Sequence, residues 1–276
     1  MQQIKAKLLF NKRLKGNYFH LMLLAPKIAK YAEPGQFVNV KVSNTDEPLL
    51  RRPFSIHRVN GANNIEILYE VVGKGTEMLS RRRPGEYLDI VGPLGKGFNY
   101  RLPITDYRLP ILVAGGMGVA PLMFLAEKLI TYNLELITVL IGAKNKSQII
   151  CADEFKKLGC TVKISTEDGS RGFRGKVTDL LSKILPKAIS HKPEGNGLPS
   201  DRQSQKPLAI YACGPSSMLK AISQLSRRYK IPAQISLEEH MACGIGACLG
   251  CAVKIRAGYR RVCKDGPVFN AEEIIW

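Results

Sequence analysis

Short apolar or alternating runs fill the first part of the chain, from Ile4 to about Leu102. Runs of this kind occur at 37–42, 65–72 and 87–91. The turn-forming pairs that separate them are Pro34-Gly35, Asn60-Gly61, Pro84-Gly85 and Gly92-Pro93. Short strands with turns at this spacing are typical of antiparallel sheets. The pattern therefore predicts an antiparallel β-barrel domain over residues 1–102.

After Pro103 the chain alternates between strand-like and helix-like runs. The strand-like runs are 111–114, 136–142, 161–165 and 208–212, and the helix-like runs are 122–132 and 177–184. This alternation predicts a parallel sheet with helices on its faces, an α/β domain over residues 103–230. Residues 188–207 are polar and rich in proline and glycine, and they predict a mobile surface insertion without a chemical role. Residues 231–276 form a short third module.

The composition is that of a folded protein with a strong positive charge. Of the 276 residues, 45% are hydrophobic and 23% are charged, which excludes global disorder. Lys plus Arg is 41 and Asp plus Glu is 23, so the net charge is +18. Such a charge attracts phosphorylated cofactors, acidic partners, membrane surfaces or nucleic acid. Because the basic runs are short and no basic tail carries interleaved aromatics, we expect no nucleic-acid partner.

The longest apolar stretch, from Leu109 to Ala126, is interrupted by three glycines and two prolines. It predicts a strand, a loop and a helix rather than a transmembrane helix of about 20 residues. The segment from Met1 to Lys15 has neither a continuous apolar region nor a small-residue cleavage site, so it does not resemble a secretory signal. We therefore expect a cytoplasmic protein without a transmembrane segment.

Four of the seven cysteines lie close together near the C-terminus, in the pattern C-x4-C-x2-C-x11-C. They are Cys243, Cys248, Cys251 and Cys263. The first three have the plant-type [2Fe-2S] spacing, and the glycines between them leave room and backbone N–H groups for the cluster. A four-cysteine zinc site is the alternative, but it usually pairs two C-x2-C units and only one is present. The other cysteines, Cys151, Cys160 and Cys213, are predicted to be unpaired thiols, the first two in the core or at the surface.

The segment Arg52-Pro53-Phe54-Ser55 opens a predicted strand and has the side chains that a flavin site requires. Pro53 and Phe54 can form a wall against the isoalloxazine, and the Ser55 hydroxyl can reach the region of flavin N5. Arg52 can neutralise a pyrophosphate, together with the amides and the hydroxyl of Gly75-Thr76. The alternative is a surface strand followed by a turn.

A second candidate site begins where the predicted strand at 109–114 runs into Gly115-Gly116-Met117-Gly118. This turn leaves N–H groups for a phosphate at the start of the next helix. The pattern is G-G-x-G-x-x-P rather than G-x-G-x-x-G, so it does not fix the ligand, and a turn kept only for packing remains possible. Cys213-Gly214-Pro215 ends another strand, where Cys213 either faces the nicotinamide or is a buried spectator thiol.

The segment 166–170 follows a strand and carries Glu167 and Asp168. Carboxylates at this place can hydrogen-bond a ribose, which favours NAD over its phosphorylated form. Arg171 and Arg174 lie close by and would suit the additional phosphate of NADP, which is the alternative.

Arg52-Pro53-Phe54-Ser55, Gly75-Thr76, the segment 115–121 and Cys213-Gly214-Pro215 together resemble the ferredoxin reductase superfamily. The segments 236–248 and 262–269 are similar to a narrower family, the electron-transfer subunits of class 1B, NAD-linked dihydroorotate dehydrogenase. The resemblance covers nearly the whole chain. The insertion at 188–207 and the strongly basic charge depart from it.

The resemblance implies a flavin-binding barrel, a nucleotide-binding domain and a C-terminal [2Fe-2S] module, with FAD and the cluster as cofactors and NAD as co-substrate. It implies that the four clustered cysteines ligate the cluster. The implied FAD contacts are Arg52, Pro53, Phe54, Ser55, Leu68, Tyr69, Glu70, Gly75 and Thr76. It also implies a partner, an FMN-containing subunit that oxidises dihydroorotate in pyrimidine biosynthesis, in a heterotetramer of two copies of each chain.

On this hypothesis the chain carries electrons, and no catalytic acid or base is expected in it. A nicotinamide accepts two electrons together and a [2Fe-2S] centre carries one, so a flavin must stand between them. A reductase subunit of a hydrogenase, a sulfite reductase or a ferredoxin-linked transhydrogenase is the nearest alternative, and the ending at 265–269 argues against it. An alternative of another class is a basic, zinc-stapled binding module, which the charge would suit.

Overall fold

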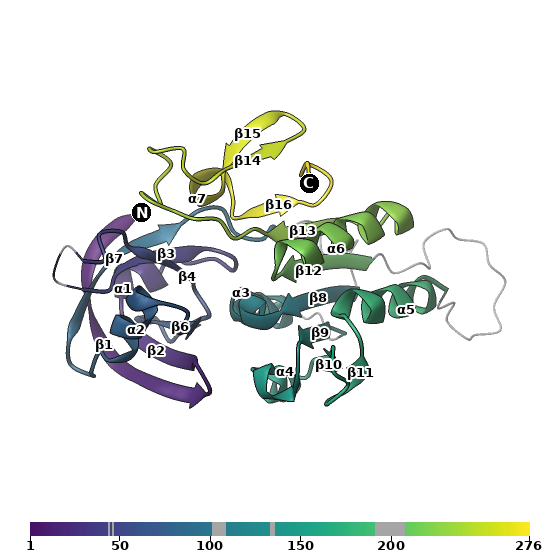
Figure 1. Cartoon of the computed structure of the whole chain (residues 1–276), viewed down its shortest axis with the longest axis horizontal. Helices are drawn as coiled ribbons and strands as arrows, with labels where there is room; N and C mark the ends of the chain where they lie inside the picture. The colour runs from purple at the N-terminus through teal and green to yellow at the C-terminus, as the bar shows by residue number, and fades with distance from the viewer. Residues whose placement is uncertain (44, 46, 101–108, 133–135, 191–207) are drawn as a thin grey trace.

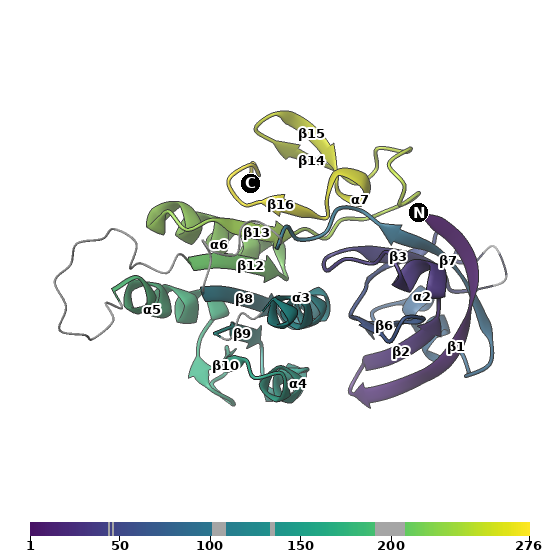
Figure 2. The same ribbon diagram turned by 180° about the vertical axis from the view of Figure 1, so that it is seen from behind.

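The computed structural model describes residues 1–43, 45, 47–100, 109–132, 136–190 and 208–276. Its described strands form two large sheets and one small hairpin. The N-terminal sheet and the α/β unit lie side by side, and the C-terminal segment runs along one edge of both (Figure 1). The view from behind shows the same arrangement (Figure 2).

The N-terminal unit is a curled sheet with the strand order β4-β3-β7-β1-β2-β6-β5, in which every neighbouring pair is antiparallel. Its strands are β1 (Gln2–Lys15), β2 (Tyr18–Leu24), β3 (Phe37–Lys41), β4 (Arg52–Ser55), β5 (Arg58–Asn60), β6 (Asn64–Glu70) and β7 (Tyr87–Leu94), and its short helices are α1 (Pro26–Ala29) and α2 (Lys74–Ser80). The rings of Phe54 on β4 and Tyr69 on β6 lie 5.6 Å apart, so the sheet curls until strands far apart in its order meet. The predicted antiparallel barrel is confirmed.

The second unit is a sheet with the order β11-β10-β9-β8-β12-β13-β16. Its strands are β8 (Leu109–Gly115), β9 (Thr138–Ala143), β10 (Thr161–Thr166), β11 (Phe173–Arg174), β12 (Leu208–Cys213), β13 (Ala233–Ser236) and β16 (Val268–Asn270), and its helices are α3 (Val119–Thr131), α4 (Ala152–Lys157), α5 (Val177–Ser190) and α6 (Ser216–Tyr229). All pairs are parallel except β13 with β16. Every residue of β12 is buried, as expected for a strand covered on both faces. The predicted α/β fold is confirmed.

The strand order reverses between β8 and β12. From β8 the chain proceeds through β9 to β10 on one side, whereas β12 and β13 lie on the other side. The carboxyl ends of β8 and β12 therefore flank a topological switch point, the usual ligand position in an open parallel sheet. The glycine-rich turn at 115–118 and the turn that begins at Cys213 both follow these ends.

Helix α5 differs from the sequence-based expectation. It extends to Ser190, whereas the polar insertion was predicted to begin at residue 188. The reason is that the apolar spacing continues, since Leu181, Leu185 and Ala188 all pack against the same core. The rest of the predicted insertion, 191–207, lies outside the described residues, as does the predicted boundary between residues 102 and 103.

The last part of the chain is tied into both sheets. Strands β14 (Ala252–Ile255) and β15 (Gly258–Arg261) form a hairpin that is followed by helix α7 (Val262–Asp265). β13 and β16 pair within the α/β sheet, and Lys96 of the barrel unit forms a bridge with Pro267. Strands β13 and β16 lie after the predicted boundary at 230/231 but belong to the α/β sheet. The boundary stays a prediction. Among the helices of the described ranges, none has the length and apolarity needed to cross a membrane.

Candidate functional site

The four clustered cysteines lie on one loop and on the short helix that follows the hairpin. Cys243 and Cys248 are the more accessible pair, while Cys251 is 3% exposed and Cys263 is 1% exposed. The Cys243 sulfur accepts backbone N–H groups from Ile245 at 3.5 Å and from Ala247 at 3.3 Å. Sulfurs that accept main-chain N–H groups are stabilised as thiolates, the form that ligates iron.

The other sulfurs follow the same pattern. Gly250 donates its N–H to the Cys248 sulfur at 3.5 Å, and Cys263 donates its N–H to the Cys251 sulfur at 3.4 Å. The thiol of Cys248 is close enough to Cys243 to lower its pKa, and that of Cys251 is close enough to Cys263 to raise its pKa. These contacts bring thiols 243 and 248, and thiols 251 and 263, together as two pairs, one near the surface and one buried.

The pKa values of the thiols differ with their surroundings. Burial raises the pKa of Cys243, but the N–H groups around its sulfur lower it by more, to about 6. Burial and the neighbouring Cys251 raise the pKa of Cys263 to about 12. A donor set of four thiols, N–H groups on the sulfurs and one thiol already prone to ionise fits a [2Fe-2S] cluster.

The path of the loop depends on glycine at two positions with positive φ. Gly244 has φ +71°, and a Cβ there would lie 2.4 Å from the side-chain amide of Asn39 on β3. Gly246 has φ +84°, and a Cβ there would lie 2.6 Å from Lys264. A larger residue at either position would require the side chain of Asn39 or of Lys264 to move.

Arg261 joins the loop to helix α7. Its guanidinium donates to the Gly246 carbonyl at 3.1 Å and to the Asp265 carboxylate at 3.0 Å, and the same carboxylate accepts the Arg261 N–H at 2.9 Å. These hydrogen bonds hold the pKa of Asp265 below its usual range. Arg261 and Asp265 lie two residues before and two residues after Cys263. Their hydrogen bonds hold helix α7, which carries Cys263, against the loop.

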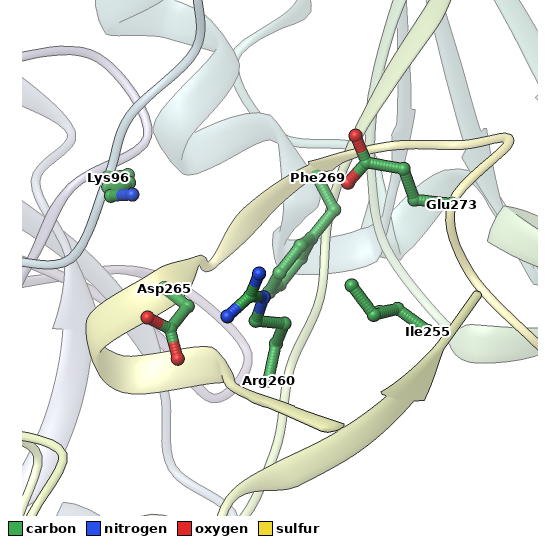
Figure 3. A pocket seen from close by; sticks show the side chains of 6 residues that line it. All are labelled: Lys96, Ile255, Arg260, Asp265, Phe269 and Glu273. Atoms are coloured by element: carbon green, nitrogen blue, oxygen red, sulfur yellow. The ribbon is translucent and has the colours of Figure 1, made fainter. Parts of the chain in front are cut away.

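A cavity of about 250 Å³ lies beside the same helix (Figure 3). Two cationic side chains, two carboxylates and two apolar groups line it, and they are Lys96, Arg260, Asp265, Glu273, Ile255 and Phe269. None of the residues predicted to contact FAD or NAD belongs to this lining.

The predicted flavin segment is brought together from two parts of the barrel. Arg52, on β4, lies against Gly75 in the first turn of α2, where a Cβ would come within 2.7 Å of the Arg52 Nε. The structure thus places the guanidinium beside the amides predicted to bind a pyrophosphate. The Thr76 hydroxyl is engaged elsewhere, because it accepts N–H groups from Val72 and Gly73 and donates to the Gly73 carbonyl. A free Thr76 hydroxyl was expected, and its role as a helix cap leaves only its amide for the cofactor.

The other predicted flavin residues divide between the two faces of the sheet. The rings of Phe54 and Tyr69 pack together in the barrel core, and the Tyr69 hydroxyl donates to Asn11 at 3.0 Å. The Phe54 ring thus packs in the barrel core, and its predicted place in a wall against the isoalloxazine stays a prediction. Leu68 instead joins the apolar cluster shared with the α/β unit. Pro53, Ser55 and Glu70 are half-buried, as residues at the rim of a ligand site can be.

The two turns at the switch point are in direct contact. A Cβ at Gly118 would lie 1.9 Å from the Cys213 carbonyl oxygen, so only glycine fits there. A Cβ at Gly115 would meet Met218 and Pro215 at 2.8 Å. Gly116 has φ +53° and open space around it, as a turn that presents its backbone to a ligand requires. The packing role and the ligand role of this turn are therefore compatible.

Cys213 is 2% exposed, and burial raises the pKa of its thiol, so it is neutral. The Ser236 hydroxyl hydrogen-bonds this thiol, and the Glu238 carboxylate is near enough to raise the pKa further. Glu238 lies in the segment 236–248, but no role was predicted for it. The pairing of β12 with β13 aligns Cys213 with Ser236, and this register brings Glu238, two residues further on, close to the thiol.

Of the two carboxylates that follow β10, that of Asp168 stabilises the turn at 167–170. Asp168 accepts the Ser170 N–H at 2.9 Å, and hydrogen bonds from the Ser170 side chain and backbone lower the pKa of Asp168. The Ser170 hydroxyl in turn accepts the Lys146 N–H at 2.8 Å. Asp168 and Glu167 are exposed beside Arg174 and the half-buried Arg171. The preference for NAD over its phosphorylated form stays a prediction.

Two family models match the chain. One, described as the iron-sulfur cluster binding domain of dihydroorotate dehydrogenase B, matches residues 238–275. The other, described as an oxidoreductase NAD-binding domain, matches residues 112–224. The first contains all four clustered cysteines, and the second contains both turns of the switch point.

Known proteins resemble the chain over nearly its full length. The dihydroorotate dehydrogenase B (NAD(+)) electron transfer subunit of Desulforamulus reducens is 39% identical over 276 residues, which cover 98% of this chain and 97% of that protein. A solved NADH-dependent reduced ferredoxin-NADP oxidoreductase is 27% identical, with a TM-score of 0.80 over 99% of this chain and 90% of that one. A ferredoxin NADP+ reductase from Neisseria gonorrhoeae, solved with FAD and NADP, shares the fold with a TM-score of 0.65 at 16% identity, over 83% of this chain and 92% of that one.

An antiparallel barrel, a parallel sheet with two glycine turns at its switch point and a four-cysteine loop define a flavin- and iron-sulfur-dependent oxidoreductase with the ferredoxin reductase fold. Its cofactors are FAD and a [2Fe-2S] cluster, with NAD as co-substrate. Within that class, the chain belongs to the family of the dihydroorotate dehydrogenase B electron transfer subunits.

Proposed function

We propose that this chain passes electrons from the FMN of a dihydroorotate-oxidising subunit, through its [2Fe-2S] cluster and FAD, to NAD+ in pyrimidine biosynthesis. The observation that carries the proposal is the four-cysteine loop, which lies against the flavin barrel within a chain 39% identical to a named electron transfer subunit. The same chain carries the nucleotide turns at the edge of the parallel sheet.

In this proposal Cys243, Cys248, Cys251 and Cys263 ligate the cluster. The N–H groups on their sulfurs lower the cost of four thiolates in one place, and Arg261 keeps the loop against α7. The accessible pair, Cys243 and Cys248, puts one edge of the site at the surface, where a partner can reach it. The buried pair faces the interior of the chain.

The proposed FAD contacts are Arg52 and the backbone of the β4 segment, with Leu68 and Glu70 on β6 and the amides of Gly75 and Thr76. Arg52 neutralises the pyrophosphate, and Ser55 offers a hydroxyl to the isoalloxazine. When bound, FAD supplies the conversion between single electrons and the electron pair that a nicotinamide accepts. Pro53, Phe54 and Tyr69 complete the proposed set, and the packed rings of Phe54 and Tyr69 also hold β4 against β6.

The proposed NAD contacts are Gly115, Gly116 and Gly118 for the phosphates, with Cys213, Gly214 and Pro215 beside the nicotinamide. The backbone of the glycine turn binds phosphate oxygens at the start of α3. The buried thiol of Cys213 is neutral, so in this proposal it borders the nicotinamide as an uncharged group.

The domain limits 1–102, 103–230 and 231–276 belong to the same proposal, as does a cytoplasmic location. The name of the relative implies a catalytic partner. We propose that this partner contains FMN and that two copies of each chain assemble. Size-exclusion chromatography with light scattering of the co-expressed chains tests that stoichiometry.

The function is tested with the two chains purified together under anaerobic conditions. Dihydroorotate and NAD+ are added, and orotate and NADH are measured as they form. The proposal predicts that both products appear in equal amounts, and that a Cys263→Ser complex oxidises dihydroorotate with a chemical acceptor but not with NAD+. Cys160→Ser is the matched control, because it is a buried free thiol outside the cluster loop. Failure of the intact pair to reduce NAD+ would defeat the proposal.

A further inference from the structure

Two consecutive residues at the junction of β4 and β5 hold helix α3. His57 is 2% exposed, and its ring Nδ1 lies 3.0 Å from the Ala120 carbonyl oxygen in the first turn of the helix. Since a carbonyl only accepts, Nδ1 carries the proton and donates it. The His57 backbone is held in turn, because its N–H donates to the Glu66 carbonyl at 2.8 Å.

The next residue makes the second contact. The Arg58 Nε lies 2.6 Å from the Glu127 carboxylate, and both side chains are about three-quarters buried, with 24% and 28% exposed. Ala120 and Glu127 are seven residues apart, which is about two turns of an α-helix, so they lie on the same face. One dipeptide of the barrel therefore holds one face of α3 at two points.

The carboxylate of Glu66 supports this dipeptide from the neighbouring strand. It accepts Asn60 at 2.9 Å and pairs with the His20 ring at 2.8 Å. The ligand atoms of His20, His57 and Glu66 lie within 4.8 Å of one another. Because the Glu66 carboxylate already accepts from Asn60 and pairs with His20, we interpret the group as a hydrogen-bonded support for the dipeptide.

The position of the contacts links the two proposed cofactor sites. Ser55, at the end of the flavin segment, is two residues from His57, and Gly118, at the end of the glycine turn, is two residues from Ala120. Helix α3 lies on the side of the α/β unit that faces the barrel in both views (Figure 1, Figure 2). Movement of α3 against the dipeptide would therefore change the distance between the flavin and nicotinamide positions.

We infer that His57 and Arg58 form a two-point clamp on α3 that sets the distance between the flavin and the nicotinamide for hydride transfer. Both are positioning residues, and the inference rests on the proposed function. Hydride transfer needs reacting atoms about 3–3.5 Å apart, and a displacement of about 1 Å can lower such a rate about 100-fold. The clamp accounts for the buried histidine and the ion pair that lie between the barrel and the α/β unit.

The test uses the holoprotein with His57→Leu and Arg58→Met, which remove one contact each. The rate of flavin reduction at saturating NADH is expected to fall roughly 10- to 100-fold in each variant, while FAD content, flavin potential and the apparent affinity for NADH stay unchanged. His57→Asn keeps a donor near the position of Nδ1, and Arg58→Glu combined with Glu127→Arg restores the ion pair. Both are expected to recover most of the rate.

Lys15→Met is the matched control. The Lys15 ammonium donates to the Ile149 carbonyl, another contact between barrel and α/β unit that does not touch α3. This variant is expected to reduce its flavin at the wild-type rate. Wild-type rates in His57→Leu and Arg58→Met, or slow rates that follow loss of FAD, would overturn the inference.

A second measurement separates the inference from the proposed function. Hydrogen exchange of residues 119–127 reports the grip on α3 whether or not NADH reduces the flavin. The clamp predicts faster exchange there in His57→Leu and Arg58→Met but not in Lys15→Met. If the wild-type flavin is not reduced by NADH, the proposed function fails. Unchanged exchange in the clamp variants would refute the clamp itself.

Discussion

The side-chain amide of Asn39 lies 3.5 Å from the carbonyl oxygen of Cys243 and ties the cluster loop to the flavin barrel. Asn39 is fully buried on β3, opposite Pro53 of the flavin segment in the strand register. The first cluster cysteine is therefore one side chain away from the strand that carries the proposed flavin contacts. This arrangement gives the single electrons a short route between the two sites.

Substitution of Gly244 is predicted to break this contact. A Cβ at Gly244 would lie 2.4 Å from the Asn39 amide, and the backbone there has a positive φ that favours glycine. Gly244→Ala is expected to lose most of its iron and sulfide while it keeps FAD, as measured by iron-to-flavin ratio. Ala242→Ser, at an exposed position next to Cys243, is the control and should keep the wild-type ratio. A full iron content in Gly244→Ala would contradict the loop geometry.

Removal of the Arg52 guanidinium is predicted to weaken FAD binding. A hydrogen bond to a charged group contributes about 1.5–3 kcal/mol, so Arg52→Met should raise the FAD dissociation constant roughly 10- to 150-fold. Quenching of flavin fluorescence during reconstitution of the apoprotein measures this constant. Arg51→Met is the matched control, since Arg51 pairs with Asp89 at 2.9 Å on the barrel itself. If both variants bound FAD with the same dissociation constant, Arg52 would not be an FAD contact.

Cys213 offers a test of the two roles left open for it. If its thiol borders the nicotinamide, Cys213→Ala should lower the rate of flavin reduction by NADH about tenfold or more and leave iron and FAD contents unchanged. Cys151→Ala provides the comparison, because it is another buried thiol, whose pKa burial raises to about 12, but it lies in the loop before α4. A Cys213→Ala rate equal to that of Cys151→Ala would assign Cys213 a packing role only.

His57 predicts a loss of stability in acid. Burial lowers the pKa of His57 to about 3, against about 6.5 in an unfolded chain. Between these values the unfolded chain binds one proton more than the folded one, so folding stability decreases as the pH falls below about 6.5. The slope from this group is about 1.4 kcal/mol per pH unit.

Urea unfolding of the holoprotein at a series of pH values from about 7.5 to 5.5 measures that slope. His57→Asn has no titrating ring, so its stability should depend less steeply on pH than that of the wild type. An identical pH dependence in both proteins would mean that His57 is not buried in its neutral form.

The sequence predicts best those parts of the chain whose determinants are local. The cluster cysteines are recognisable because one loop and one nearby helix supply all four, so their spacing carries the geometry. Strands β8 and β12 are recognisable as unbroken apolar runs because both faces of a parallel sheet are buried. The turn at 115–118 follows from its glycines alone.

The contacts that hold the sites together are long-range, and no local pattern indicates them. His57 and Ala120 are 63 residues apart in sequence, and Asn39 and Cys243 are 204 residues apart. The cap formed by Thr76 is an exception, because its partners Val72 and Gly73 lie only four and three residues before it; the hydroxyl was predicted to bind the cofactor instead. The ring of Phe54 meets that of Tyr69 in the barrel core, a contact between β4 and β6 that the motif around Phe54 does not indicate.

The most direct test of the electron path is low-temperature paramagnetic resonance of the anaerobically prepared wild-type chain after addition of NADH. The account predicts a rhombic signal typical of a reduced [2Fe-2S] centre, with two irons and two sulfides per chain, and its absence in Cys263→Ser. A wild-type protein that binds FAD and NADH yet contains zinc in place of iron, or gives no such signal on reduction, would contradict the account.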